Sequence, residues 1–452
     1  MAKSGYLTAP VPSKKMPAGI PYILTTEASE RFAFYGMSSI LVVFMTKYLM
    51  GPNGMLDVMA DEPAKAWFHW FTSAVYFMPL VGAVISDVWL GKFKTIIWFS
   101  LLYCVGFAVL ASDHTRLGLI GGLALIAMAS GIIKPCLSAN VGDQFGPSNK
   151  HLIERFYGWF YFSINLGACV SMFVCPILLD KYGPMVGFGV PGVFMVIATA
   201  TYWLGRHKLV HIRSAGKSGF RRMLDREGAR TLGKLCIIFL FVSMFFALFY
   251  QSESAWVLQA GKMNLKWLGI NWLPAQMQFA NPFLIMILIP LFSYVIYPAL
   301  NRLWTLTLLR KIGIGMFLTA ASFLVPVWIE TQLERGVQPS IGWQFVAYIF
   351  LTGAEVMVSI TALEFAYTQA PRKMKSLIQS VNLLSISLGN VFAAVVNDVI
   401  KNEDGTSKLP GASYYWFFVI AMLVTAVVFI FVARRYREKT YIQDENSAAS
   451  KS

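Results

Sequence analysis

Long apolar runs recur along the whole chain of 452 residues, and short segments rich in charged residues, glycine or proline separate them. Each run is close to the ~20 residues that an α-helix needs to cross ~30 Å of hydrocarbon. The pattern predicts an all-α membrane protein. Its twelve expected transmembrane helices lie at residues 20–49, 64–86, 93–112, 116–138, 153–179, 186–204, 232–258, 277–300, 307–328, 341–369, 374–400 and 412–434.

The composition agrees with this class, because only 13% of the residues are charged, whereas a soluble domain carries about 25%. The formal net charge of +15 lies at the ends of the predicted spans, so we expect a lipid bilayer and no nucleic acid as a partner. With both termini in the cytoplasm, 27 of the 38 Lys and Arg lie on the cytoplasmic side and nine on the outer side. Cytoplasmic loops are enriched in Lys and Arg, so this distribution predicts cytoplasmic termini.

The longest basic loop divides the chain into two halves of six spans each, as in transporters built from repeated bundles. We expect a cytoplasmic tail at 1–19, a six-helix bundle at 20–204, a cytoplasmic linker at 205–231, a second bundle at 232–434 and a tail at 435–452. The polar N-terminus lacks the order of a secretory signal, so the first span is expected to remain in the mature protein.

Three ionisable residues, Glu27, Glu30 and Arg31, stand inside the first span in TTEASERFAFYG. A charge at the bilayer centre costs about 2.5–3.5 kcal/mol, so such groups usually face the bundle interior and serve a pathway. Their spacing places all three on one helical face. Arg31 can neutralise only one glutamate fully, and burial disfavours an ionised carboxylate, so the other glutamate is a candidate proton acceptor. The alternative is a static ion-pair cluster that only fixes helix packing.

Lys134 lies deep in the fourth span, directly before Pro135, whose ring prevents a regular helical hydrogen bond. Such breaks are tolerated where they line a cavity. A lone lysine there needs a carboxylate, either a first-span glutamate or the carboxylate of a substrate. The alternative is that the side chain extends to the cytoplasmic surface.

The second half carries its own acidic residues. In the seventh span Phe246, Tyr250 and Glu253 form one stripe at helical spacing. In the tenth span Glu355 and Glu364 are nine residues apart, about 900° of rotation, which places them on opposite faces of a regular helix. Glu355 is the better candidate for a cavity because small residues flank it.

Three further polar residues allow two interpretations each. His69 near the start of the second span can titrate near physiological pH or serve as an interfacial anchor beside tryptophans. Asn165 and Asn281 can donate to and accept from a peptide bond, or they can join helices to one another.

A cationic pole at Arg31 and Lys134 and an anionic pole at Glu355 match a small zwitterion that lies between the halves. Variable side chains of such a ligand suit broad apolar contact, which discriminates weakly. The aromatic candidates for these walls are Tyr35, Tyr76, Tyr161, Phe246 and Trp256.

Five separated segments resemble signature motifs of one family. They are TTEASERFAFYG, GAVISDVWLGKFKT, SGIIKPCLSANVGDQF, FYFSINLGA and GAEVMVSITALEFAYTQAPRKMKS. In this order they resemble motifs of the proton-coupled oligopeptide transporter family of the major facilitator superfamily. The second segment is similar to the superfamily's gating loop motif, carried here by Asp87, Gly91 and Lys92.

The resemblance implies the major facilitator fold and a proton-coupled symporter that imports di- and tripeptides across the plasma membrane by alternating access. Protons are then the coupling ion, with no other cofactor. Tyr250 stands where many members carry an acid, and Glu253 follows one turn on. The residues implied in proton coupling are Glu27, Glu30, Arg31, Lys134, His69 and Glu253. Those implied in peptide binding are Arg31, Tyr35, Tyr76, Lys134, Asn165, Phe246, Trp256, Asn281, Glu355 and Asn382.

Two other functions remain open at this stage. Relatives in the same family also move anions such as nitrate, so a proton-coupled transporter of a non-peptide anion is the first alternative. A peptide sensor that does not transport is the second, although it would need an output domain. We expect no enzyme, because neither a nucleophile–base pair nor a phosphate loop nor metal-ligand spacing is visible. We expect a monomer in a plasma membrane, with a bacterial inner membrane as the expected location.

Overall fold

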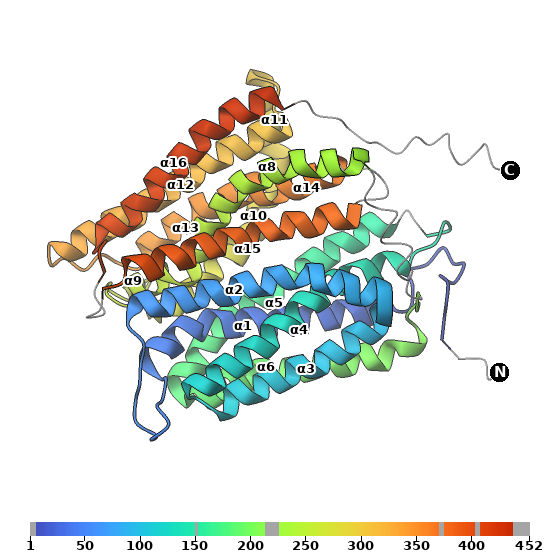
Figure 1. Ribbon diagram of the computed structural model, residues 1–452, viewed down its shortest axis with the longest axis horizontal. Coiled ribbons are helices and arrows are strands. Elements are labelled where there is room, and N and C mark those ends of the chain that lie inside the picture. The colour runs from blue at the N-terminus through green and yellow to red at the C-terminus, as the bar shows by residue number, and fades with distance from the viewer. Residues whose placement is uncertain (1–5, 150–151, 213–225, 370–374, 403–406, 437–452) are drawn as a thin grey trace.

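The computed structural model describes residues 6–149, 152–212, 226–369, 375–402 and 407–436 and is almost entirely helical (Figure 1). The first half contains α1 (Ile20–Lys47), α2 (Asp61–Val84), α3 (Lys92–Ser112), α4 (Arg116–Asp143), α5 (Ile153–Tyr182) and α6 (Pro184–Leu204). The second half contains α8 (Arg226–Phe249), α9 (Ala255–Ala260), α10 (Ala280–Leu291), α11 (Tyr297–Leu303), α12 (Leu308–Glu334), α13 (Gly342–Glu355), α14 (Thr361–Thr368), α15 (Lys375–Ile400) and α16 (Ala412–Arg435).

Short segments of other geometry connect or interrupt these helices. The π-helical segments are η1 (Ile85–Leu90), η6 (Phe292–Ile296) and η7 (Val356–Ile360). The 3₁₀ segments are η3 (Gly205–His207), η4 (Tyr250–Glu253) and η5 (Pro274–Phe279). Strands β1 (Lys266–Trp267) and β2 (Ile270–Asn271) pair antiparallel in a small hairpin. Because η4 lies between α8 and α9, and η7 between α13 and α14, the seventh and tenth predicted spans are helical runs with a local irregularity.

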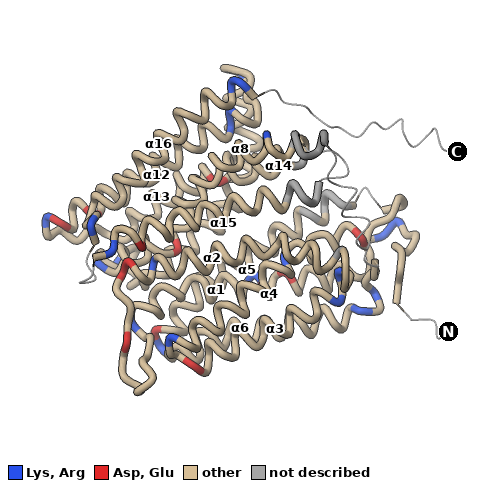
Figure 2. Tube along the Cα trace, viewed as in Figure 1, with Lys and Arg blue, Asp and Glu red and all other residues tan. Residues whose placement is uncertain are grey.

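Eleven helical runs in the described chain are long and apolar enough to cross a membrane. They match eleven of the predicted spans to within a few residues, so the chain is a multi-pass membrane protein. The first predicted span is also helical, as α1, but Glu27, Glu30 and Arg31 interrupt its apolar sequence. Figure 2 shows the same pattern, with the charged residues gathered toward the two ends of the helices and sparse along their middles.

The helices of each half pack mainly against one another. In the first half α1 contacts α5 and α6, while α3 contacts α4 and α6; in the second, α12 contacts α13 and α16. Figure 1 shows α1, α3, α4 and α6 in the lower layer of the view and α8, α12 and α16 in the upper one. The halves meet where α2 packs along α15 and α5 packs on α10.

The two ends of the helical bundle are distinguished by the course of α1. The terminal end of the bundle is the end where α1 begins, and the far end is the end where α1 stops and α2 begins. At the far end Met50, just after α1, is bridged to Leu56 and to Thr115, which precedes α4. Part of the predicted linker at 205–231, and residues 437–452 of the predicted C-terminal tail, lie outside the described residues.

Candidate functional site

The three charged residues of α1 form one buried ion-pair cluster. Nε of Arg31 lies 3.1 Å from Oε1 of Glu27, and a terminal nitrogen of Arg31 pairs with Oε2 of Glu30. All three side chains are less than a tenth exposed. Arg31 therefore contacts both carboxylates with a single positive charge, and which glutamate accepts a proton stays a prediction. The cluster still carries one more negative than positive charge, so a proton can neutralise it.

Lys134 on α4 is half-buried with its Nζ enclosed, and none of the ion pairs among the described residues includes it. Among the described residues its Nζ has no hydrogen-bond partner, and it lies 3.9 Å from the ring centre of Phe34 and 4.6 Å from that of Tyr76. The faces of aromatic rings attract a cation, although more weakly than a carboxylate does. The idea that Lys134 extends to the surface is wrong, and the expected pairing with a first-span glutamate is not formed. Its ammonium group is left available for an anionic group.

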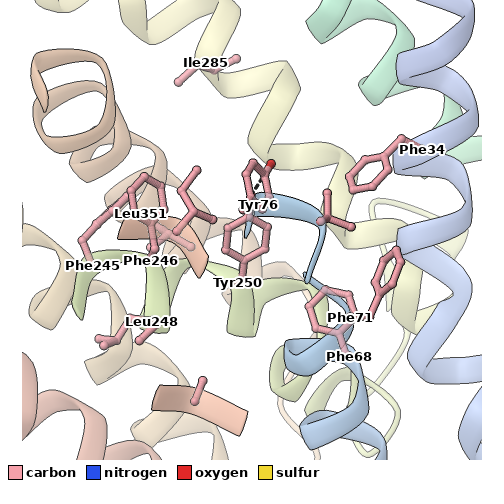
Figure 3. Packing of buried hydrophobic residues seen from close by; sticks show 14 of the residues in the cluster. Phe34, Phe68, Phe71, Tyr76, Phe245, Phe246, Leu248, Tyr250, Ile285 and Leu351 are labelled. Carbon is pink, nitrogen blue, oxygen red and sulfur yellow. Dashed lines mark hydrogen bonds between the residues drawn. The ribbon is translucent and has the colours of Figure 1, made fainter. Parts of the chain in front are cut away.

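The acid of the seventh span, Glu253 in η4, accepts a hydrogen bond from the first half of the protein. Oγ of Ser38 on α1 donates to Oε2 of Glu253 over 2.6 Å. Nearby, the hydroxyl of Tyr250 donates to the hydroxyl of Tyr76 on α2 over 2.7 Å, as the dashed line in Figure 3 shows. The order Lys134, Tyr76, Tyr250 is thus a continuous chain of contacts from α4 through α2 to the end of α8.

Phe246 lies one turn before Tyr250 and is 5% exposed. The two ring centres are 6.5 Å apart, and Figure 3 shows both side chains among the buried hydrophobic residues near Tyr76. The predicted stripe of the seventh span is therefore present up to Tyr250. It then tightens into η4, which sets the direction of Glu253.

Glu355, the last residue of α13, is tied to α10. Nδ2 of Asn281 donates to Oε2 of Glu355 over 2.7 Å and lies 3.2 Å from Oγ1 of Thr352. Glu364 on α14 is exposed, whereas Glu355 is mostly buried. The two glutamates differ in environment as expected. The π-helical η7 lies between them, however, so a rotation of 100° per residue does not describe this segment.

His69 on α2 is completely buried. Its Nδ1 lies 2.7 Å from Oδ1 of Asn390 on α15, and its Nε2 lies 3.1 Å from Oγ of Ser254. The interpretation as an interfacial anchor is therefore wrong. The exposed neighbour Trp70 takes a surface position instead and donates to Asp398. Nothing in the local pattern around His69 identified its partners, and Asn390 is one of several amides in its span.

The remaining polar candidates occupy different environments. Nδ2 of Asn165 donates to the backbone oxygen of Tyr161 within α5, and Tyr161 itself is 39% exposed. Asn382 on α15 is 6% exposed, and its Oδ1 has no hydrogen-bond partner among the described residues. The side-chain oxygen of Asn382 is thus a buried acceptor without a donor among the described residues. The side chain of Asn165, in contrast, donates one hydrogen bond within its own helix.

The aromatic candidates also differ in how far they are buried. Tyr35 on α1 is half-buried and meets Phe34 edge-on, with ring centres 5.4 Å apart. Trp256 on α9 has no exposed surface and packs between Phe323 and Tyr348. Trp256 is therefore enclosed within the second half, whereas Tyr35 keeps part of its surface exposed.

The loop motif after α2 joins two helices of the first half. Gly91 has a φ of 76°, a left-handed conformation that favours glycine. Directly after it, Nζ of Lys92 forms an ion pair of 2.7 Å with Asp143 at the end of α4. The side chain of Asp87 lies outside the described residues. Asp143, in the segment GDQF, is the partner of this motif that the spacing alone did not reveal.

Several hydrogen bonds join the halves in the far-end part of the bundle. Besides those of Glu253 and His69, Ser73 on α2 and Ser387 on α15 lie 2.9 Å apart through their hydroxyls. Nε2 of Gln278 in η5 donates to the backbone oxygen of Ser39 on α1. All of these groups lie in far-end portions of their helices, so the far end is closed in this structure.

Comparisons with known proteins agree on one family. The family model described as the POT family matches residues 93–227 and 211–417. The chain is 34% identical to Peptide transporter family 1 of Drosophila melanogaster over 376 residues, which is 73% of this chain and 49% of the relative. It is 32% identical to Solute carrier family 15 member 2 of Homo sapiens over 402 residues, 77% of this chain and 54% of that protein. The chain therefore spans about half the length of these curated relatives.

Solved structures are similar over nearly their full length. The crystal structure of the POT family transporter PepTSo superposes with a TM-score of 0.85 and 35% identity, covering 93% of this chain and 98% of that one. An auto-inhibited POT family peptide transporter gives a TM-score of 0.85 and 32% identity, covering 95% of this chain and 99% of that one.

Proposed function

The chain belongs to the POT family, and we propose that it is a proton-coupled symporter that imports di- and tripeptides by alternating access. The observation that carries this proposal is the pair of oppositely charged poles on the helices of the two halves. Arg31 and Lys134 provide positive charge in the first half, and Glu355 provides a carboxylate in the second. Lys134 has no acidic partner among the described residues, so the carboxylate of a substrate suits it.

The topology completes the proposal. Adding α1 to the eleven apolar helical runs gives twelve membrane helices. The two six-helix bundles then correspond to residues 20–204 and 232–434, and both termini are cytoplasmic. The excess of Lys and Arg in the loops of the terminal end supports this orientation. The closed far end then faces outward. The matching membrane is a plasma membrane, with a bacterial inner membrane as the proposed location and a monomer as the proposed unit.

The peptide is held by its two ends. Its carboxylate binds Lys134 and Arg31, because both are cations with enclosed nitrogen donors for an anionic oxygen. Its ammonium group binds Glu355, whose position Asn281 fixes by a hydrogen bond. Asn165, Asn281 and Asn382 supply amides for the peptide backbone. The walls for variable side chains are Tyr35, Tyr76 and Phe246, whereas Trp256 is enclosed within the second half and supports the bundle there.

Proton coupling uses the groups whose partners change with the substrate. When the peptide carboxylate draws Arg31 and Lys134 toward itself, Glu27 and Glu30 lose positive charge beside them, and protonation relieves the repulsion. Glu253 and His69 lie at the contact between the halves. A proton on either group removes or reverses a hydrogen bond there, and so changes how firmly the far end is closed. Gly91 and Lys92 of the loop motif keep the end of α4 attached to the start of α3 while the halves move.

The test is uptake of a labelled dipeptide into liposomes that contain the purified protein, with and without an inward proton gradient. We expect accumulation only with the gradient, and competition by unlabelled tripeptide but not by nitrate. Competition by nitrate with none by tripeptide would replace the peptide with an anionic substrate. Saturable peptide binding without any uptake would make the protein a sensor.

A further inference from the structure

A second polar cavity lies at the far end, outside the proposed peptide and proton site. This far-end pocket encloses about 420 Å³, within the ~300–1,000 Å³ typical of small-molecule sites. None of the residues assigned above to peptide binding or proton coupling lines it. The residues that line it are Ala60, Asp61, Glu62, Lys65, Ala255, Leu258, Gln259, Lys262, Glu330, Ser407, Leu409, Pro410, Gly411, Tyr414 and Tyr415.

On one wall of the far-end pocket, a lysine and a glutamate already bind each other. Nζ of Lys65 on α2 hydrogen-bonds to Oε1 of Glu62 over 2.8 Å and lies 3.8 Å from the ring centre of Tyr414 on α16. Lys65 is 5% exposed and Glu62 is 7% exposed. The pair therefore forms a fixed part of the wall, and it joins the first half to the second.

The opposite wall has acceptors that lack donors. Nε2 of Gln259 donates to Oε2 of Glu330 over 2.8 Å, but Oε1 of Gln259 is buried without a partner among the described residues. Glu330 is only 8% exposed, and its Oε1 lies 3.7 Å from Nζ of Lys262, too far for a hydrogen bond. The Lys262 side chain is 54% exposed, so it can move away at little cost. Buried acceptors without donors are costly, and a bound donor relieves that cost.

We propose that the far-end pocket binds a small primary ammonium compound, such as an amine or an amino acid amide, between Glu330 and Gln259. An ammonium group has three donors and no acceptor, which matches the carboxylate of Glu330 and the amide oxygen of the Gln259 side chain bonded to it. The lining charges agree, since Asp61, Glu62 and Glu330 outnumber the two lysines. Because the walls come from α2 in one half and from α9, α12 and α16 in the other, the ligand holds the far end closed.

Binding is tested with glycinamide as the probe and the melting temperature of the purified full chain as the measurement. We expect a saturable rise in melting temperature with glycinamide and none with neutral N-acetylglycinamide. Glu330→Gln removes a charge-assisted hydrogen bond worth about 1.5–3 kcal/mol, so it should weaken the apparent affinity about tenfold or more. Absence of a saturable rise in the parent protein would overturn the proposal, and so would equal affinity in Glu330→Gln.

Three variants separate this site from other causes. Lys262→Met removes an exposed competing cation and should tighten binding up to about fivefold, since exposed ion pairs contribute about 0.2–1 kcal/mol. Asp57→Asn is the matched control, because Asp57 is a carboxylate of the same end and the Arg116 guanidinium holds its pKa below the usual value. It should leave the glycinamide affinity unchanged. Glu355→Gln should also leave it unchanged, whereas loss of binding in that variant would place the probe at the proposed peptide site and refute the far-end pocket.

The melting measurement reads binding alone, so it does not depend on the proposed transport. Where uptake is confirmed, glycinamide added outside should slow it in the parent protein and have no effect in Glu330→Gln. Equal inhibition of both proteins would refute the regulatory part of the proposal.

Discussion

Ser38 on α1 donates a hydrogen bond of 2.6 Å to the carboxylate of Glu253 in η4, so a serine of the first half holds an acid of the second. The two residues are 215 positions apart in the chain. This bond is one of several that close the far end, and its acceptor is a carboxylate, as is that of the bond from Trp70 to Asp398. Loss of the hydrogen bond from Ser38 should therefore change how readily the two halves separate.

Ser38→Ala should shift the protein toward a form that is open at the far end. A hydrogen bond to a charged group contributes about 1.5–3 kcal/mol, which corresponds to a change of about tenfold or more in the ratio of closed to open forms. Distances between spin labels at the far ends of α1 and α9 measure that ratio. Ser39→Ala is the control, because Oγ of Ser39 bonds only within α1, to the oxygen of Gly36. Identical distance distributions for both variants would show that the Ser38 bond does not hold the far end closed.

Glu27→Gln or Glu30→Gln should abolish peptide accumulation driven by a pH gradient, while peptide counterflow partly survives. Each substitution removes a carboxylate that a proton would neutralise, and it leaves the geometry beside Arg31 almost unchanged. Uptake into liposomes with and without a gradient is the measurement. Glu364→Gln, at an exposed glutamate, should behave like the parent protein. If both variants still accumulate peptide with the gradient, the proton role of this cluster fails.

Glu355→Ala should weaken binding of peptides with a free amino group about tenfold to a hundredfold, and that of N-blocked peptides far less. The reason is the loss of one charge-assisted hydrogen bond to the ammonium group. Competition against a labelled dipeptide gives both affinities. An equal loss for the two kinds of peptide would remove Glu355 from this role. Asn281 loses its partner as well, so Glu355→Gln, which retains an acceptor for it, serves as the second variant.

Asn390→Leu should lower the free energy of unfolding by about 1–3 kcal/mol, because it leaves Nδ1 of the buried His69 without its partner. The double variant Ser73→Ala/Ser387→Ala is the contrast. It removes both members of a nearby polar pair on the same two helices, which is nearly neutral when no buried group is left unpaired. Melting temperatures in detergent compare the two. A larger loss in the serine variant would show that His69 does not depend on Asn390.

Gly389→Ala should destabilise the protein by about 1–3 kcal/mol through overpacking. An added Cβ at this position on α15 would overlap the backbone oxygen of Ser243 on α8, which cannot move without shifting the helix. Gly313→Ala on α12 is the matched control, since its Cβ would make an ordinary contact of 3.7 Å with the ring of Phe429. Melting temperatures should fall for the first variant and stay close to the parent value for the second. Similar values for both would mean that α8 and α15 are not packed this closely.

The sequence alone predicted the helices well, because the signal for a membrane span is local. About twenty apolar residues must form a helix in lipid to satisfy their own backbone groups, whatever their neighbours are. The same logic identified Glu27, Glu30 and Arg31 as neighbours on one face of α1. Even there, a local irregularity was missed: η7 after Glu355 depends on how α13 packs, and no residue type marks a π-helical turn.

The partners of the buried polar groups could not be read from the sequence. Lys134 lies on the rings of Phe34 and Tyr76, His69 bonds to Asn390 and Ser254, and Glu253 accepts from Ser38. The far-end pocket likewise brings Lys65 together with residues about 200 to 350 positions away, a separation that no local pattern records.

The sequence by itself determined that this chain spans a membrane many times and places charged groups inside it. Its tertiary structure decided which of those groups meet. The physical reason is that hydrophobicity acts residue by residue, while a hydrogen bond needs two groups within about 3 Å in the right direction. That distance depends on the rotation, depth and crossing of helices from both halves, and these are set only when the whole bundle packs.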